Sequence, residues 1–331
     1  MAVKVAINGL GRIGRCVARI IADRDDIELV VVNASGTHEM LEYNVKYDSV
    51  HGTRKDAKVS DGYLYLGNDK AKILAERDPK KLNFSEYGAE VVLECTGAFL
   101  TQESVQPYLD NGVKKVVFSA PAKDDTATFV IGANENEYAG QAVVSNASCT
   151  TNGLAPVAKV LDDAFGIENG LMTTIHSYTA SQPILDGKHK KDPRKGRSGA
   201  VNLVPTTTGA AKAIAKVLPS LAGKINGQAI RVPTPDVSMV DLTVTLNKSV
   251  TLDDIKEAFK TASEGSHQGI LGVDEEFRVS QDFVGEALST VVAMDTIQVI
   301  GDKMVKVLSW YDNEWGYSCR LVDMALLVSK K

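Results

Sequence analysis

The residue best suited to covalent chemistry is Cys149, which lies in the stretch SNASCTTNG at residues 145–153. The run LAPVAKVLDDAF follows and predicts a helix that begins at the cysteine. Unpaired amides and the positive end of the helix dipole lower the pKa of a thiol at such a position. We therefore expect Cys149 to be a nucleophile that is ionised at neutral pH. The alternative is a small buried side chain in a polar turn.

A thiolate nucleophile needs a partner base, and His176 is the best candidate. It ends the predicted strand GLMTTIH, whereas the other histidines lie in polar loops or turns (His38, His51, His189 and His267). A lone histidine in a strand is more often structural than catalytic. The assignment therefore depends on the cysteine and on the signals for a cofactor.

A dinucleotide-binding turn is predicted near the N-terminus, where INGLGRIGR carries Gly9, Gly11 and Gly14 in the spacing G-x-G-x-x-G. An apolar strand ends at Ile7 and an amphipathic helix starts near Arg12. The amides at this helix start would face a pyrophosphate. A tight turn without a ligand is the alternative.

Further strands are predicted to end at Glu94 to Thr96, at Phe118 to Ser119 and in QAVVSNAS. In a doubly wound sheet the ligand lies across the carboxyl ends of the strands. Thr96, Gly97 and Ser119 are therefore expected near the cofactor.

The second strand ends in VVVNASG, and Ala34 occupies the place where an Asp or Glu usually binds the ribose hydroxyls. Without that carboxylate a 2′-phosphate is not repelled, which opens NADP as the cofactor. Whether Asp26 or Glu28 binds the ribose hydroxyls instead stays open.

Two further features suggest anion binding. TTTGAAKA places Thr206 to Gly209 at a helix start, and Arg231 lies in an otherwise apolar strand, where an unpaired guanidinium is costly, so we expect it to meet an anion. The loop at 187–197 reads GKHKKDPRKGR. Its basic residues are Lys188, Lys190, Lys191, Arg194, Lys195 and Arg197, and taken alone it is best interpreted as a solvated charged loop.

The chain of 331 residues is 44% hydrophobic and long enough for two cores. We predict a Rossmann-type α/β dinucleotide-binding domain at 1–147, with the C-terminal helix at 313–331 packing back on it. A catalytic α+β domain with a largely antiparallel sheet is predicted at 148–312.

Composition narrows the function classes. The net charge of −5 argues against nucleic acid as the main partner. The cysteines, Cys16, Cys95, Cys149 and Cys319, are too far apart to suggest a metal site or a disulfide scaffold. Without a leader-like segment or an apolar run of about 20 residues, a soluble cytoplasmic protein is expected.

At INGLGRIGR, YDSVHG, SNASCTTNG, HSYT, TTTGAAKA, RVPTPDVS and SWYDNEWGYS, in order along the chain, the sequence resembles phosphorylating glyceraldehyde-3-phosphate dehydrogenases. The resemblance implies oxidation of glyceraldehyde 3-phosphate with NAD(P) and inorganic phosphate to 1,3-bisphosphoglycerate, through a thioester on the cysteine. It also implies a homotetramer, in which the loop near 178–203 helps to complete a neighbour's cofactor site.

The same resemblance assigns roles to individual residues. Cys149 matches the nucleophile and His176 the general base. Thr179 and Arg231 match the site for the substrate's phosphate. The site for the attacking phosphate is matched by Ser148, Thr150, Thr208 and Gly209, and cofactor contacts by Arg12, Ile13, Arg77, Ser119 and Asn313, with Tyr317 beside the nicotinamide ring.

Three positions depart from the family pattern. Gly153 stands where a second cysteine is usual, and Ala34 where NAD-dependent members carry an aspartate. Gly187-Lys188 replaces a usual Leu-Pro pair, so that Lys188 could meet a 2′-phosphate. We predict NADP use alongside NAD. Which of Arg194 and Arg197 approaches the substrate stays open, as does the physiological direction.

Other functions share some of these features. Erythrose-4-phosphate dehydrogenase shares the cysteine and the histidine but does not need the inorganic phosphate site. A semialdehyde dehydrogenase lacks this set of motifs, and a cysteine hydrolase would not need the glycine turn. RNA association is an alternative secondary binding role, which would not explain Cys149.

Overall fold

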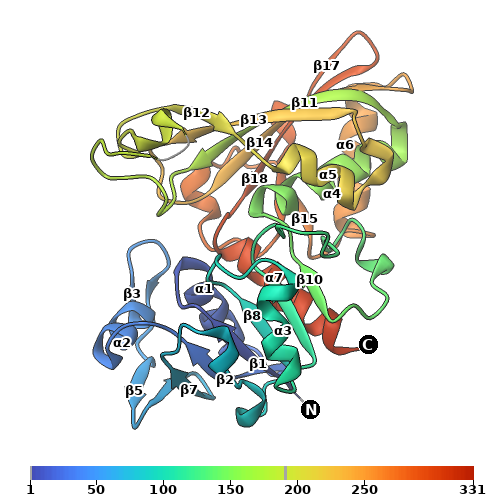
Figure 1. The fold of residues 1–331 in the computed structure, drawn as a ribbon. Coiled ribbons are helices and arrows are strands. Elements are labelled where there is room, and N and C mark those ends of the chain that lie inside the picture. Colours follow the sequence, from blue (N-terminus) through green and yellow to red (C-terminus); the bar gives the residue numbers. More distant parts are fainter. Residues whose placement is uncertain (1, 190–191) are drawn as a thin grey trace. The chain divides into compact units, whose positions relative to one another are not determined.

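The computed structural model describes residues 2–189 and 192–331, so Lys190 and Lys191 of the predicted basic loop lie outside the described residues. The chain forms two compact units (Figure 1). The first contains the residues up to 129 together with 135–148 and 318–331, and the second contains 130–134 and 149–317. Among the described residues, every helix is too short or too polar to span a bilayer.

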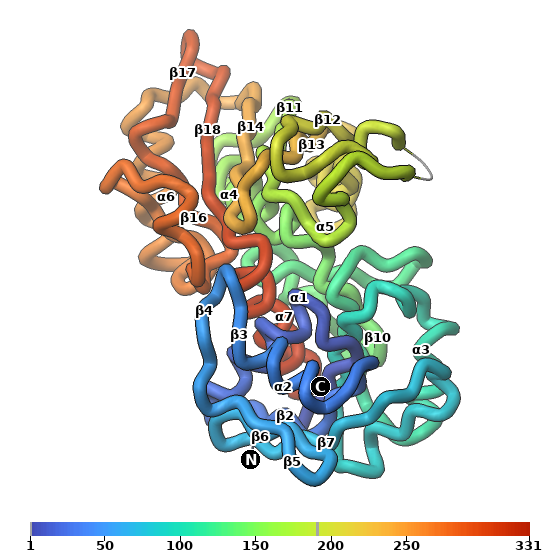
Figure 2. Tube along the Cα trace, turned by 90° about the vertical axis from the view of Figure 1, so that its left-hand side faces the viewer, coloured from blue at the N-terminus to red at the C-terminus, as the bar shows by residue number. Residues whose placement is uncertain are grey.

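The first unit is built on a twisted sheet with the strand order β10-β9-β8-β1-β2-β7-β6-β5. Its parallel strands are β1 (Val3–Asn8), β2 (Ile27–Asn33), β7 (Asp69–Leu74), β8 (Val91–Glu94), β9 (Lys115–Phe118) and β10 (Val143–Ser145). The central strands are almost continuously apolar, because both faces of a parallel sheet are buried. Figure 2 shows the antiparallel β5 (Lys58–Ser60) and β6 (Tyr63–Leu66) beside β7.

Helices connect these parallel strands. α1 (Arg12–Ile21) joins β1 to β2, and α3 (Gln102–Asp110) joins β8 to β9. Between β2 and β5 lie α2 (His38–Lys46) and the small ribbon of β3 (Tyr47–Asp48) and β4 (Gly52–Thr53). The short 3₁₀ helices are η1 (Pro79–Lys81), η2 (Ser85–Tyr87) and η3 (Glu135–Glu137). This strand-helix alternation gives the Rossmann-type class that the sequence predicts.

The last helix, α7 (Trp315–Ser329), belongs to the first unit from Ser318 onward. Leu321 and Val322 are fully buried, and the Tyr138 hydroxyl lies 3.3 Å from the carbonyl oxygen of Val328 and donates to it. Arg24 also donates to Asp323 of this helix at 2.9 Å. The end of the chain is therefore an integral part of the core of this unit.

The second unit has a mainly antiparallel sheet with the strand order β12-β13-β11-β14-β18-β16-β15 and with β17 beside β18. Its strands are β11 (Ile167–Ser177), β12 (Val204–Thr207), β13 (Ile225–Val232), β14 (Ser238–Leu246), β15 (Leu271–Asp274), β16 (Thr290–Ala293), β17 (Gln298–Ile300) and β18 (Met304–Tyr311). Within the described strands of this sheet, only β11 with β13 and β15 with β16 are parallel neighbours. The α+β class predicted for this half is confirmed.

Helices cover one face of this sheet. α4 (Cys149–Phe165) contacts α5 (Ala210–Val217), α6 (Leu252–Glu264) and the central strands. It continues through Pro156, and Leu154, Val157 and Leu161 are fully buried. The 3₁₀ helices are η4 (Pro193–Gly196), η5 (Pro219–Leu221), η6 (Ser280–Phe283) and η7 (Met294–Thr296). A nucleophile at the start of α4 is therefore anchored to the core of its unit.

The three glycines after β1 differ in whether the backbone or the packing requires a glycine there. Gly9 adopts φ +98°, a left-handed conformation that side chains disfavour. A Cβ on Gly14 would lie 2.0 Å from the carbonyl oxygen of Gly9, so the start of α1 can approach the turn only without a side chain. A Cβ on Gly11 would meet nothing within 4 Å. Gly11 is therefore not required by packing.

We predict opposite stability effects for Gly14→Ala and Gly11→Ala. The first forces a backbone overlap and should lower the free energy of unfolding by about 1–3 kcal/mol. The second should change it by less than about 0.5 kcal/mol. Denaturant unfolding of both variants measures the difference, and equal destabilisation would contradict the assigned packing role of Gly14.

Candidate active site and dinucleotide cavity

A cavity of about 510 Å³ opens at the carboxyl ends of the parallel strands in the first unit. This volume lies within the range of small-molecule and cofactor sites. Of the predicted cofactor residues, its lining includes Gly9, Gly11, Ala34, Arg77 and Thr96. Because Gly11 faces open space at the start of α1, a pyrophosphate can approach the helix amides there. The residues present fit a dinucleotide.

The floor of this cavity is a chain of buried polar side chains that sequence reasoning missed. Asn8 donates to the carboxylate of Glu94 at 2.6 Å, and Asn33 donates to the side-chain oxygen of Asn8 at 2.7 Å. Asn33 also exchanges two hydrogen bonds with the backbone of Glu76, at 2.8 and 3.0 Å. The turn before Arg77 is thereby tied to the strand ends.

A sequence signal for this chain of side chains exists. β1, β2 and β8 are apolar strands that each end in one polar residue, and the parallel register aligns Asn8 with Asn33 on one side and with Glu94 on the other. Burial raises the pKa of Glu94, and hydrogen bonds from Thr96 and Asn8 oppose that rise. The strand ends are thus linked by side chains as well as by backbone.

The side chain of Arg12 contacts an aspartate of its own unit. Its guanidinium forms a two-bond ion pair with Asp48, the longer bond being 3.1 Å. Burial opposes ionisation of Asp48, but the hydrogen bond from Arg12 and the His51 and Val50 amides hold its pKa well below the usual range. The backbone amide of Arg12, in the first turn of α1, remains the group suited to face a phosphate.

The other predicted cofactor residues lie outside the lining of this cavity. In the first unit, Ile13 and Gly14 follow Arg12 in α1, Gly97 has φ +70°, and the Ser119 hydroxyl donates to the Glu94 carbonyl at 2.9 Å. In the second unit, Asn313 and Tyr317 are buried and Lys188 is exposed. The Asn313 side-chain oxygen accepts from the Ser238 hydroxyl at 2.5 Å.

In the second unit the structure brings Cys149 and His176 together. Cys149 begins α4, His176 lies at the end of β11, and the sulfur is 3.5 Å from Nε2 of the imidazole. This separation permits proton transfer between the thiol and the ring. The pairing predicted from two distant sequence segments is therefore present.

The surroundings of the pair are less favourable to charge than the helix start alone suggests. Burial raises the pKa of the Cys149 thiol, and the positive charge of Arg231 opposes that rise. This corrects the expectation that the helix start sets the pKa. Burial, with a further contribution from Arg231, lowers the pKa of His176 to about 3. The ring is therefore a neutral imidazole at physiological pH.

Arg231 is the third member of this cluster, because the parallel register of β11 and β13 sets it directly beside His176. Its Nη1 lies 2.9 Å from Nδ1 of His176 and donates to the carbonyl oxygen of Ser177 at 2.8 Å. Within the described part of the chain, no carboxylate forms an ion pair with it. In the structure the guanidinium contacts an imidazole and a carbonyl oxygen, and the anion that the sequence predicts for Arg231 stays a prediction.

Tyr311 is a site residue that sequence reasoning missed. Its hydroxyl bonds to Thr150 of α4 at 2.9 Å and to Thr174 of β11 at 2.8 Å. Its ring lies edge-on to His176, with centroids 6.0 Å apart. A Cβ on Gly153 would lie 3.0 Å from this ring. Tyr311 thus connects the helix that carries the thiol to the strand that carries the imidazole.

The residues predicted for phosphate binding lie on separate segments of the chain. Thr179 follows β11, with its hydroxyl 2.9 Å from that of Ser181. Thr208 accepts from the Ala210 amide at 3.2 Å, and Gly209 caps α5. The Thr150 hydroxyl bonds to that of Tyr311, and Ser148 directly precedes Cys149. Of these residues, Thr208 and Gly209 are at the predicted helix start.

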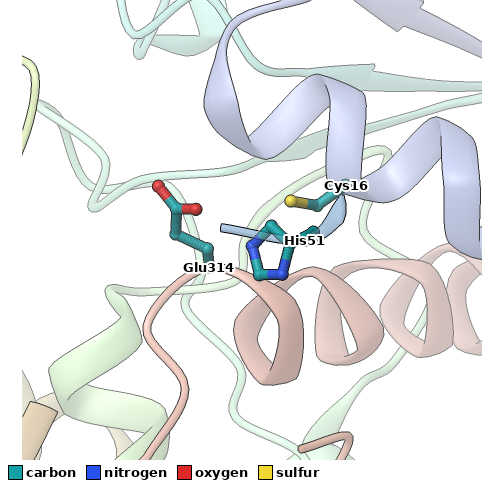
Figure 3. Close-up of side chains that lie close together, drawn as sticks. All are labelled: Cys16, His51 and Glu314. Atoms are coloured by element: carbon teal, nitrogen blue, oxygen red, sulfur yellow. The ribbon is translucent and has the colours of Figure 1, made fainter. Parts of the chain in front are cut away.

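Another thiol and imidazole lie together in the first unit. Cys16 of α1 and His51 offer ligand atoms within 4.8 Å of one another (Figure 3). Glu314, the third side chain drawn there, belongs to the second unit. Two ligands are fewer than the three or four protein residues of a zinc site, so we assign no metal to this pair.

Comparison with known families shows the family to which the chain belongs. The family model described as "Glyceraldehyde 3-phosphate dehydrogenase, C-terminal domain" matches residues 148–313, and the corresponding "NAD binding domain" matches residues 3–102. The chain belongs to the glyceraldehyde 3-phosphate dehydrogenase family. The resemblance seen in the sequence motifs is thus confirmed over most of the chain.

Full-length relatives agree with this family assignment. The chain is 51% identical over 331 residues to glyceraldehyde-3-phosphate dehydrogenase of Shimwellia blattae, with all of both chains covered. It is also 51% identical over 332 residues to glyceraldehyde-3-phosphate dehydrogenase A of Escherichia coli K12, again with full coverage. The match to the Salmonella typhimurium enzyme is equally long and equally similar.

We predict that Tyr311→Phe will lower kcat about tenfold to a hundredfold with little change in KM, because the thiol and the base lose a shared anchor. The matched control is Tyr138→Phe, which removes another buried hydroxyl bonded to two carbonyl oxygens, but in the first unit. Each variant should lose about 1–3 kcal/mol of stability. Steady-state kinetics distinguishes them, and equal losses of kcat would contradict the positioning role of Tyr311.

Proposed function

We propose that this chain is a phosphorylating glyceraldehyde-3-phosphate dehydrogenase, with NAD(P) as hydride acceptor and inorganic phosphate as second substrate. The observation that carries the proposal is the 3.5 Å contact between Cys149 and His176, in a chain whose other unit has a dinucleotide cavity. The names of the relatives favour glyceraldehyde 3-phosphate over erythrose 4-phosphate. We assign most of the cofactor contacts to the first unit, and catalysis to the second.

The first half of the reaction follows from the cysteine and the histidine. The sulfur of Cys149 adds to the aldehyde carbon, while His176 accepts the thiol proton and returns it to the new alkoxide. His176 then takes up the hydroxyl proton of the hemithioacetal as the carbon is oxidised. The bound dinucleotide supplies the hydride acceptor. A thioester remains on Cys149, and His176 releases its proton to solvent.

In the second half, inorganic phosphate attacks the thioester carbon and the thiolate of Cys149 leaves. The product is an acyl phosphate, and the cysteine is regenerated. Two anion sites are needed, because the substrate's own phosphate stays bound while the second phosphate approaches. We assign the first to Thr179 and Arg231, and the second to Ser148, Thr150, Thr208 and Gly209.

The remaining assignments concern the cofactor and the assembly. We propose cofactor contacts by the glycine turn, Arg77, Thr96, Gly97, Ser119, Lys188, Asn313 and Tyr317. We also propose a homotetramer, because large apolar residues such as Leu171, Leu185 and Leu203 are exposed in the second unit, and the mass of the native assembly tests this. A cytoplasmic location stays a prediction.

The central test is Cys149→Ser. A hydroxyl is far less acidic than a thiol, so the substitution should reduce substrate-dependent reduction of NAD(P) by at least about a thousandfold. Dinucleotide binding, measured by fluorescence titration, should persist. In the unmodified protein, multiple-turnover oxidation should require inorganic phosphate. Undiminished turnover by the variant, or turnover independent of phosphate, would contradict the proposal.

We predict NADP binding alongside NAD, because Ala34 lines the cavity without a carboxylate. Ala34→Asp should weaken NADP binding about tenfold or more relative to NAD, since the new charge faces the 2′-phosphate. Ala34→Asn, which adds similar bulk without charge, is the matched control. Titration of both dinucleotides measures the ratio, and the same ratio in the Asp and Asn variants would refute the electrostatic explanation.

A further inference from the structure

The dinucleotide cavity has an acid at the end of β7 rather than at the end of β2. Glu76, two residues after β7, carries the one carboxylate in the described lining. Ala34 belongs to the same lining and follows β2, where a dinucleotide fold usually has Asp or Glu for the ribose. The two strands are parallel neighbours and pair at Asn33 and Leu74. Glu76 is therefore at the same edge of the sheet as the position that lacks an acid.

Hydrogen bonds hold the backbone of Glu76 next to the end of β2. The Ala34 amide donates to the Leu74 carbonyl at 2.9 Å. The side chain of Asn33 donates to the Glu76 carbonyl at 2.8 Å and accepts from the Glu76 amide at 3.0 Å. Asn33 is buried, and its side-chain nitrogen also donates to Asn8. Because the protein already bonds both ends of the Asn33 amide, the nearest acidic acceptor for a ribose is Glu76.

The carboxylate of Glu76 is ionised and has one oxygen available. Oε1 accepts from the Arg77 amide at 2.7 Å and from the Asp78 amide at 2.9 Å. The two amides, that of Asp78 first, hold the pKa of Glu76 below its usual range. No group of the described residues bonds to Oε2. A carboxylate oxygen forms strong, charge-assisted hydrogen bonds with hydroxyl groups, so Oε2 is suited to a sugar.

The two acids that the sequence left open lie at the other end of β2. Glu28 is six residues before Ala34, a distance of about 20 Å along an extended strand. Asp26 precedes the strand and is paired with Arg24 through bonds of 2.9 and 2.7 Å. Neither acid belongs to the described lining of the cavity. Of the three carboxylates, Glu76 is the one placed to meet the ribose.

We propose that Glu76 is a specificity-determining residue, which accepts the hydroxyls of the adenosine ribose in place of the acid that is absent at position 34. The inference rests on the proposed function, in which a nicotinamide dinucleotide occupies this cavity. Since a carboxylate repels a phosphate, Glu76 favours the free 2′-hydroxyl of NAD, whereas the small, uncharged Ala34 admits NADP. The ratio of the two affinities is therefore set by both positions.

The first test compares Glu76→Gln with Asp78→Asn in the full-length protein, by fluorescence titration with NAD and with NADP. Glutamine keeps an oxygen for the two amides but loses the charge, so the affinity for NADP relative to NAD should rise about tenfold. Asp78 is the matched control, because it accepts the Lys80 amide at 3.0 Å in the same segment but does not line the cavity. Asp78→Asn should leave the ratio unchanged. An unchanged ratio in Glu76→Gln, or an equal shift in both variants, would overturn the inference.

The second test uses an NAD analogue whose adenosine ribose lacks the 2′-hydroxyl. The unmodified protein should bind it about tenfold more weakly than NAD, and Glu76→Gln should bind the two about equally. A preference for NAD that persists undiminished in Glu76→Gln would overturn the inference, because another group would then accept the hydroxyl. An unmodified protein that binds neither NAD nor NADP would refute the proposed function, whereas NAD binding that does not depend on Glu76 refutes this inference alone.

Discussion

The site depends on one contact, the 3.5 Å approach of the Cys149 sulfur to Nε2 of His176. The contact requires the first residue of a largely buried helix to meet the end of a central strand. The hydroxyl of Tyr311 fixes that meeting by bonding to Thr150 and Thr174. Packing and polar contacts thus act together, since the apolar body of α4 sets the position of the helix and the tyrosine sets the position of its first turn.

Burial of this contact affects the charges of the pair in two ways. Removing water from the pair disfavours charge on both groups, which is why the pKa of the thiol is raised and that of the imidazole lowered. The same removal of water strengthens the effect of a single nearby charge. Arg231, which is half-buried beside the ring, therefore has more influence on the reactivity of the pair than an exposed arginine would have.

The elements of the fold were largely predictable from the sequence. Continuous apolar strands, the spacing of Gly9, Gly11 and Gly14, and the alternation within β14 each reflect a local physical requirement. Strand register was not predictable, because it is set by tertiary packing. Register is what places Arg231 beside His176, so this pairing could not be seen in advance. The effect of burial on Cys149 was missed for the same reason.

Gly153 has a consequence for oxidative chemistry. It lies one turn along α4 from Cys149, against the ring of Tyr311, and the helix contains no other cysteine. A sulfenic acid formed on that sulfur has no resolving thiol on its own helix. Its repair would depend on a small thiol entering from solvent, and without one, further oxidation would lead to the irreversible sulfinic state.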